Sequence, residues 1–142
     1  MKKLLLLLIM GISTISFSQE ISLFDKDGDA VAYIDTDDDL TIYLWSGKPV
    51  CYLHSSSGKY HVYGFNGSHL GWFIEGVIRD HEGDAVGVTK EATSMFTNFE
   101  PFKGFKEFKP FKSFKEFAPF QPFLSSSFSS TNFKLFLLQG SK

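Results

Sequence analysis

Four stretches of the sequence repeat one short unit: LFDKDGDAVAY (residues 23–33), YLWSGKPVCY (43–52), YGFNGSHLGW (63–72) and IRDHEGDAVGV (78–88). Each unit is centred on a glycine, at Gly28, Gly47, Gly67 and Gly83. Three positions after the glycine comes an aliphatic residue, then a small residue, then a large apolar one. A unit that recurs in constant phase predicts four copies of one supersecondary element.

The spacing and the flanks of these glycines predict β-hairpins. Successive glycines lie 19, 20 and 16 residues apart, which leaves room for two short strands and a connection. Asp27-Gly28 and Asn66-Gly67 are strong signals for a tight turn, because both central positions tolerate a positive φ. The flanking residues are β-branched or aromatic, and residues 21–88 show no helical periodicity. We therefore expect an all-β fold.

A single hairpin is barely stable in water, so the four hairpins must share one core. Four-fold repetition favours a closed arrangement around an axis. We expect the small residue of each unit to lie near that axis and its large neighbour to point the opposite way. The small residues are Ala32, Cys51, Gly71 and Gly87. The sequence leaves open which of the two faces is the core.

Four motifs in one phase connect these units to a known family. They are FDxDGxxVAYI from Phe24, YLWxGxPV from Tyr43, YGFNGxxLGWF from Tyr63 and IRDxxGxxVG from Ile78. Together they resemble the bacterial four-fold β-flower proteins, over roughly residues 21–92. The resemblance implies four hairpin petals in a shallow, symmetric barrel. It implies no established activity and no catalytic residue, and only a fold-level similarity to tubby-like, lipid-binding barrels.

The first eighteen residues have the pattern of a secretory signal peptide. Two lysines near the start precede an apolar run at residues 4–10, and the small-x-small motif SFS at 16–18 offers a cleavage site. We expect cleavage near Gln19 and a mature chain that is secreted, periplasmic or associated with the cell envelope. The apolar run is short for a membrane span, and an uncleaved anchor is the alternative.

Charge and composition divide the rest of the chain. Residues 20–94 carry 13 acidic and 5 basic side chains, whereas residues 95–142 carry 3 acidic and 7 basic ones. We assign a signal peptide (1–18), a four-hairpin domain (19–94), a phenylalanine- and lysine-rich tail (95–124), and a serine-rich linker with a short apolar C-terminus (125–142). The opposite charges indicate segments that attract each other or have separate roles. A strand is the form we consider for the apolar end, residues 133–138.

The tail has a period of three. Phenylalanine recurs at every third position from Phe96 to Phe123, ten times in all, and a nine-residue period lies on top, as in FEPFKGFKE (99–107) and FKPFKSFKE (108–116). Its prolines exclude an α-helix, and a period of three fits neither a 3.6-residue helix nor a two-residue strand. A polyproline II helix gives one phenylalanine face, one lysine face and one mixed face, and its 28 residues would span ~90 Å.

This phenylalanine stripe exceeds the apolar patch of a typical soluble monomer. Three outcomes are open: packing on the barrel with lysines meeting its acids, contact with a membrane or cell-wall surface, and self-association. A disordered low-complexity segment with no single partner is a fourth. The tail residues that we expect to make contacts are Phe99, Phe102, Phe105, Phe108, Phe111, Lys103, Lys106, Lys109 and Lys112.

The sequence contains no recognisable acid–base or nucleophile constellation, so we expect no enzyme. The DKDGD segment at 25–29 faintly resembles a calcium loop but fits a hairpin turn better, and the acidic run at 35–39 has the pattern of a solvated connection. The histidines are His54, His61, His69 and His81. They lack zinc-site spacing, and the single cysteine has no thiol partner, so we expect no metal, cofactor or internal disulfide. Interleaved acids argue against nucleic acid.

The aromatic residues around the turns are the best binding candidates. They are Tyr33, Trp45, Tyr52, Phe65 and Trp72. Around a four-fold axis they would form a bowl suited to sugars, lipid chains or polymers, and the alternative is that they simply form the core. We expect a secreted, non-catalytic module that binds a hydrophobic, lipid or glycan partner of the envelope. The second hypothesis is a structural or adhesion protein whose tail drives self-association or surface attachment.

Overall fold

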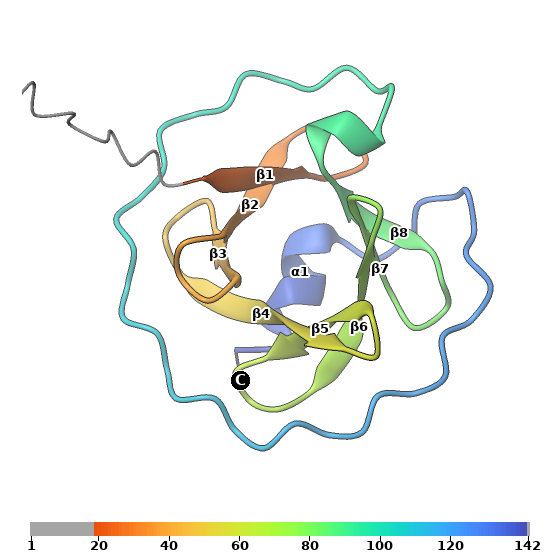
Figure 1. Cartoon of the computed structure of the whole chain (residues 1–142). Helices are drawn as coiled ribbons and strands as arrows, with labels where there is room; N and C mark the ends of the chain where they lie inside the picture. The colour runs from red at the N-terminus through yellow and green to blue at the C-terminus, as the bar shows by residue number, and fades with distance from the viewer. Residues whose placement is uncertain (1–18, 142) are drawn as a thin grey trace, which may run out of the picture.

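The computed structural model describes residues 19–141, so the expected signal peptide lies outside the described residues. Eight strands form a closed antiparallel barrel in chain order (Figure 1). The strands are β1 (Glu20–Phe24), β2 (Ala30–Asp35), β3 (Thr41–Leu44), β4 (Pro49–Ser56), β5 (Lys59–Gly64), β6 (His69–Ile74), β7 (Val77–Arg79) and β8 (Ala85–Val88). The expected all-β barrel of four hairpins is confirmed.

All four glycine-centred turns have the same backbone conformation. They join β1 to β2, β3 to β4, β5 to β6 and β7 to β8, and their glycines have φ of 83–98°. Each hairpin shifts register four residues before its glycine, as between Leu23 and Phe24 in the first. Only the glycine of each turn is left-handed. The turn is therefore a three-residue loop with a glycine bulge, and not a two-residue turn with two positive φ angles.

A short helix, α1 (Phe133–Leu138), fills the barrel (Figure 1). Its buried residues Phe133, Phe136 and Leu137 pack against the inward-facing aliphatic residues of the strands. The expectation of a strand here is wrong. The spacing of these residues puts them on one helical face, and the Asn132 side chain caps the helix by accepting the Leu135 N–H at 3.0 Å.

The small residue of most units makes room for α1. Ala32 and Cys51 belong to the interior cluster, and a side chain at Gly87 would overlap the Phe133 ring. The Cys51 thiol also contacts the Leu137 carbonyl at 3.4 Å. At Gly71 the close neighbour is instead the β7 backbone. Contact with the helix, more than crowding between strands, explains why small residues occupy these positions in the units.

The large residues of the units lie on the outer surface of the barrel. This aromatic band consists of Tyr33, Tyr43, Trp45, Tyr52, Tyr63, Phe65 and Trp72. Tyr33 stacks on Tyr43 with ring centroids 5.6 Å apart, and Tyr52 stacks on Tyr63 at 6.3 Å. The inner, aliphatic face is therefore the core. Except for Trp45, the band is nevertheless buried, because another segment covers it.

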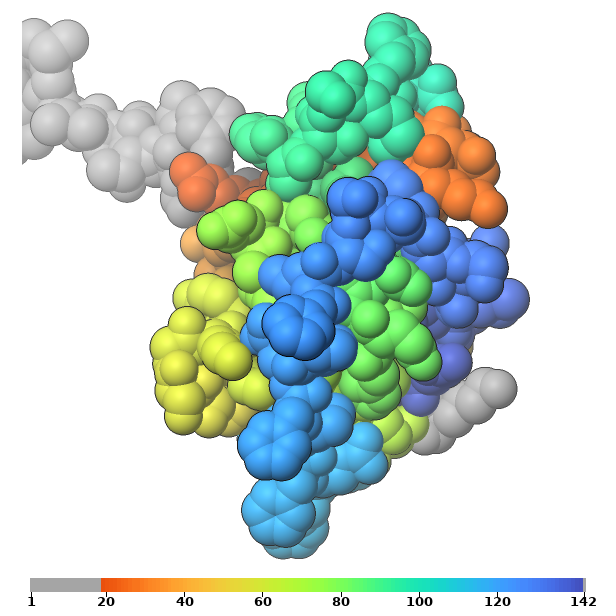
Figure 2. Space-filling model, turned by 90° about the vertical axis from the view of Figure 1, so that its right-hand side faces the viewer, coloured from red at the N-terminus to blue at the C-terminus, as the bar shows by residue number. Residues whose placement is uncertain are grey.

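The covering segment is the tail. Residues 95–125, here called the belt, run in an extended conformation around the outside of the barrel (Figure 1). Figure 2 shows part of the belt as a raised band that crosses one side of the molecule. The three-residue alternation of faces is present. However, the phenylalanines point away from the barrel, and the lysines and backbone N–H groups face it.

Candidate binding surface: the belt and its phenylalanine collar

Backbone hydrogen bonds fix the belt to the four hairpin turns. The pairs, written as donor N–H to acceptor carbonyl, are Asn98 to Gly28, Glu107 to Gly47, Glu116 to Gly67 and Ser125 to Gly83, at 2.8–3.1 Å. The four donors are spaced by nine residues, and the four acceptors are the repeat glycines. One nine-residue unit of the belt therefore spans the distance from one hairpin to the next.

A second set of donors follows the same period. The Gly104 N–H donates to the Trp45 carbonyl and the Ser113 N–H to the Phe65 carbonyl, both at 2.9 Å. The next member of this series is Pro122, which has no N–H. The other prolines of the belt lie on the same face, at Pro101, Pro110 and Pro119. Prolines thus occupy the positions of this face that donate nothing to the barrel.

The turns and the belt approach each other closely. A Cβ atom at Gly47 would overlap the Phe105 carbonyl, and one at Gly104 would overlap the Ser46 carbonyl. Gly28, Gly67 and Gly83 meet the carbonyls of belt phenylalanines in the same way. Glycine is therefore required at each turn twice, for its positive φ and for the passage of the belt.

Lysines of the belt pair with acids of the barrel. The pairs are Lys103 with Glu20 at 2.7 Å, Lys106 with Glu20 at 2.9 Å and with Asp35 at 2.5 Å, Lys109 with Asp38 at 2.6 Å, and Lys112 with Asp39 at 2.5 Å. The acidic run at 35–39 is thus not a merely solvated connection. Three of its carboxylates receive the belt, and the Asp35 side chain is only 4% exposed.

The pairing shifts the pKa values of Asp38, Asp39 and Lys106. The Lys109 ammonium, helped by the Tyr43 hydroxyl, lowers the pKa of Asp38, and Lys112 lowers the pKa of Asp39. Burial alone would lower the pKa of Lys106, but its two carboxylate partners outweigh burial and raise it. Asp38, Asp39 and Lys106 are therefore held in their charged forms over the neutral pH range.

Three of the five aromatic residues that the sequence singled out, Tyr33, Trp45 and Tyr52, contact the belt directly. The Lys103 ammonium is 4.7 Å from the Tyr33 ring centroid and 4.8 Å from that of Trp45, and the Lys112 ammonium is 4.1 Å from that of Tyr52. The Trp45 indole N–H donates to the Pro101 carbonyl at 2.9 Å. Phe65 and Trp72 are buried as well. The aromatic band is therefore the seat of the belt, with cation–π contacts as part of the attachment.

The outer edge of the belt carries a ring of ten exposed phenylalanines, here called the collar. They are Phe96, Phe99, Phe102, Phe105, Phe108, Phe111, Phe114, Phe117, Phe120 and Phe123, and their side chains are 84–104% exposed. The collar follows the belt around most of the barrel (Figure 1). Such a continuous apolar surface on a folded protein typically marks an interaction site.

This architecture agrees with the comparison against known families. The family model described as 4-fold beta flower protein matches residues 21–137. The chain belongs to the 4-fold beta flower protein family. No curated protein and no solved structure matches it. The match extends past the four hairpins, across the belt and into α1.

The β-flower barrel also contains a histidine row that the spacing of histidines in the sequence did not reveal. His69 Nε2 lies 3.0 Å from His61 Nδ1, and His69 Nδ1 lies 3.0 Å from His81 Nε2. His69 is only 2% exposed, and burial, with a smaller contribution from the two neighbouring rings, lowers its pKa to about 4. His69 is therefore neutral at pH 7, and its two ring nitrogens form hydrogen bonds with the two neighbouring rings.

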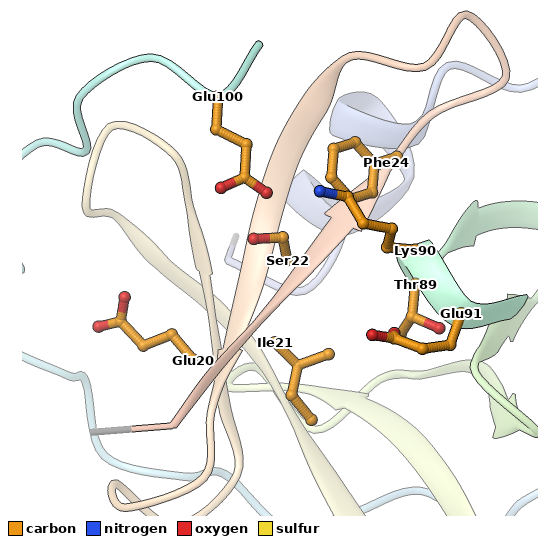
Figure 3. Close-up of a pocket in the computed structure, with 8 residues that line it drawn as sticks. All are labelled: Glu20, Ile21, Ser22, Phe24, Thr89, Lys90, Glu91 and Glu100. Atoms are coloured by element: carbon orange, nitrogen blue, oxygen red, sulfur yellow. The ribbon is translucent and has the colours of Figure 1, made fainter. Parts of the chain in front are cut away.

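A hollow of about 500 Å³ lies beside the seam between β1 and β8, where a single residue pair closes the β-flower barrel (Figure 3). Its lining residues are Glu20, Ile21, Ser22, Phe24, Thr89, Lys90, Glu91 and Glu100. It is open to solvent, and the Glu20 carboxylate is already paired with two belt lysines. The lining combines three carboxylates with the Lys90 ammonium and the hydroxyls of Ser22 and Thr89.

The remaining motifs have local structural roles. The Asp25 carboxylate accepts the N–H groups of Asp27 and Asp29, as expected of a hairpin turn. Across residues 19–141, no three His, Cys, Asp or Glu side chains are grouped to hold a metal ion. Within the same residues, no helix has the length and apolar character needed to cross a membrane.

Proposed function

We propose that this β-flower protein is a non-catalytic binding module that presents its phenylalanine collar to an apolar partner. The supporting observation is that one side of the belt contacts the barrel and the other side is exposed to solvent. Four of its five lysines and the N–H groups of its mixed face bind the barrel, while every phenylalanine of the collar is left in solvent. Ten exposed rings in a row are costly in water unless a partner covers them.

The partner contacts the collar and not the aromatic band. Tyr33, Trp45 and Tyr52 contact belt lysines, so their role is to seat the belt that carries the collar. The collar itself consists of benzyl groups without a hydrogen-bonding atom. This composition favours an apolar partner over a glycan, which needs hydrogen bonds as well as stacking.

The site of action follows from the expected signal peptide. The chain is exported, and the module acts in the periplasm, at the envelope or outside the cell. Within residues 19–141, we identify no acid–base or nucleophile arrangement that favours an enzymatic alternative.

Chromatography on a phenyl matrix tests this function. The chain lacking residues 1–18 should be retained, and the variant F102S/F105S/F108S/F111S should elute much earlier. These four side chains are 99–104% exposed, so the substitutions remove no packing contact. The variant F102L/F105L/F108L/F111L is the matched control and should remain bound. Equal retention of wild type and the serine variant would refute an apolar binding role of the collar.

A further inference from the structure

We propose that the partner of the collar is a second copy of the same chain, whose collar interdigitates with the first. This inference rests on the proposed function and names its partner. Four properties of the collar carry it: the pitch of its rings, its lack of charge, its circular path and its area.

The pitch of the collar suits another collar. Three residues of extended chain separate successive phenylalanines, which is about 9 Å in polyproline II geometry. A ring placed midway between two such neighbours would lie about 4.7 Å from each, within the 4.5–7 Å centroid separations that aromatic pairs prefer. A partner with evenly spaced rings of the same pitch fills every gap. A second copy of the belt has the same sequence and therefore the same spacing of phenylalanines.

Four of the five lysines of the belt are directed away from the collar. Lys103, Lys106, Lys109 and Lys112 pair with barrel carboxylates, and their side chains are only 30–36% exposed. Two collars can therefore meet without bringing these ammonium groups into contact. An anionic membrane surface, in contrast, would be recognised by lysines on the outer edge.

The circular path of the collar also argues against a flat partner. The belt touches all four hairpin turns and runs around most of the barrel (Figure 1), so its exposed phenylalanines are distributed along a ring. A planar bilayer could cover only one arc of such a ring. Copies of the chain arranged side by side could cover several arcs at once.

The area of one arc is close to what a specific interface needs. Three phenylalanines span one nine-residue unit, and at about 200 Å² each they offer about 600 Å² of apolar surface. A standard interface uses about 800 Å² per partner, which residues flanking the arc can complete. Two arcs related by a two-fold axis form a self-complementary contact, and further arcs remain free for other copies.

Sedimentation velocity of the chain lacking residues 1–18, from about 1 to 100 µM, tests this inference. We expect mass to rise with concentration beyond a dimer, F102S/F105S/F108S/F111S to lower the association at least about tenfold, and the leucine control to preserve it. A monomer throughout would overturn the inference. If that monomer is still retained on the phenyl matrix, the proposed function stands; if it is not retained, both fail.

A membrane partner is the competing outcome. We expect no co-sedimentation with vesicles of phosphatidylcholine, or of phosphatidylcholine with phosphatidylglycerol. Vesicle binding that the serine variant loses, together with a monomeric protein, would overturn the inference and identify a lipid surface as the apolar partner.

Discussion

At the scale of single residues, the turn glycines show how one position serves two requirements. Gly47 has φ of 98°, and the Phe105 carbonyl occupies the space that a Cβ would take. Gly58, in the turn between β4 and β5, has φ of 75° but open space around it. A comparison of substitutions at these two glycines therefore distinguishes the cost of backbone strain from the cost of displacing the belt.

We expect Gly58→Ala to lower the free energy of unfolding by about 1–2 kcal/mol, the usual cost of a left-handed alanine. Gly47→Ala should cost at least about 3 kcal/mol, because it also displaces the belt and its hydrogen bonds. Urea denaturation of the two variants measures the difference. Equal losses would show that the belt does not press on this turn.

The histidine row predicts a pH dependence. The pKa of His69 falls to about 4 in the folded state from 6.5, so the unfolded chain binds a proton more readily between these values. The groups that face His69 are His61, His81 and the Glu116 carboxylate, which accepts the His69 backbone N–H. Stability should therefore fall as the pH drops from about 6.5 to about 4, by on the order of 2–3 kcal/mol.

The variant His69→Gln should flatten this part of the stability profile, whereas His54→Gln, on a ring outside the row, should leave most of it in place. Urea denaturation at several pH values provides the measurement. A wild-type profile that is level from pH 6.5 to 4 would contradict the buried, neutral state of His69.

At the scale of elements, the attachment of the belt depends on the N–H groups that donate hydrogen bonds to the barrel. The Ser113 N–H donates to the Phe65 carbonyl, whereas the Ala118 N–H donates no hydrogen bond within the described residues. We expect Ser113→Pro to cost about 1–2 kcal/mol of local stability and Ala118→Pro to cost little, since extended chain accepts the φ of proline.

Chymotrypsin, which cleaves after phenylalanine, offers a readout of local opening along the belt under native conditions. Cleavage of Ser113→Pro should be about 5–30 times faster than that of wild type, and cleavage of Ala118→Pro close to wild type. If both variants are cleaved equally fast, the hydrogen bonds do not hold the belt.

The helix α1 provides a second test of an element. Leu137 is fully buried in the barrel, whereas Leu135 on the same helix is 62% exposed. Leu137→Ala should lower the free energy of unfolding by about 2–5 kcal/mol, and Leu135→Ala by less than about 0.5 kcal/mol. Thermal and urea denaturation measure both. A small loss for Leu137→Ala would mean that α1 is not part of the core.

The hairpins could be predicted from sequence because their signals are local. A glycine with an aliphatic residue three positions later specifies a turn and a strand without reference to distant residues. The conformation of the apolar C-terminal segment was harder to predict. Residues 133–138 are too few to show helical periodicity clearly, and only the barrel interior, which they fill, decides their conformation.

The path of the belt could not be predicted, although its period was visible. The nine-residue repeat is a distance between hairpin turns, and that distance exists only after the barrel has closed. The acids at 35–39 and the lysines of the belt were recognised as opposite charges, but their pairing depends on the same closure. The histidine row likewise joins strands whose register no local signal specifies.

At the scale of the whole molecule, the acidic barrel and the basic tail form one unit. The barrel supplies turn carbonyls, carboxylates and aromatic rings, and the belt supplies N–H groups and ammonium groups at matching intervals. What remains unmatched is the collar. The central claim is therefore that the tail is a fixed belt, held at nine-residue intervals, that displays phenylalanine outward.

Amide hydrogen exchange of the belt tests this claim most directly. We predict slow exchange at Asn98, Gly104, Glu107, Ser113 and Glu116, whose N–H groups donate to the barrel, and fast exchange at the collar phenylalanines between them. The protected amides would repeat every nine residues. Uniformly fast exchange from 95 to 123 would contradict the account and indicate a disordered tail.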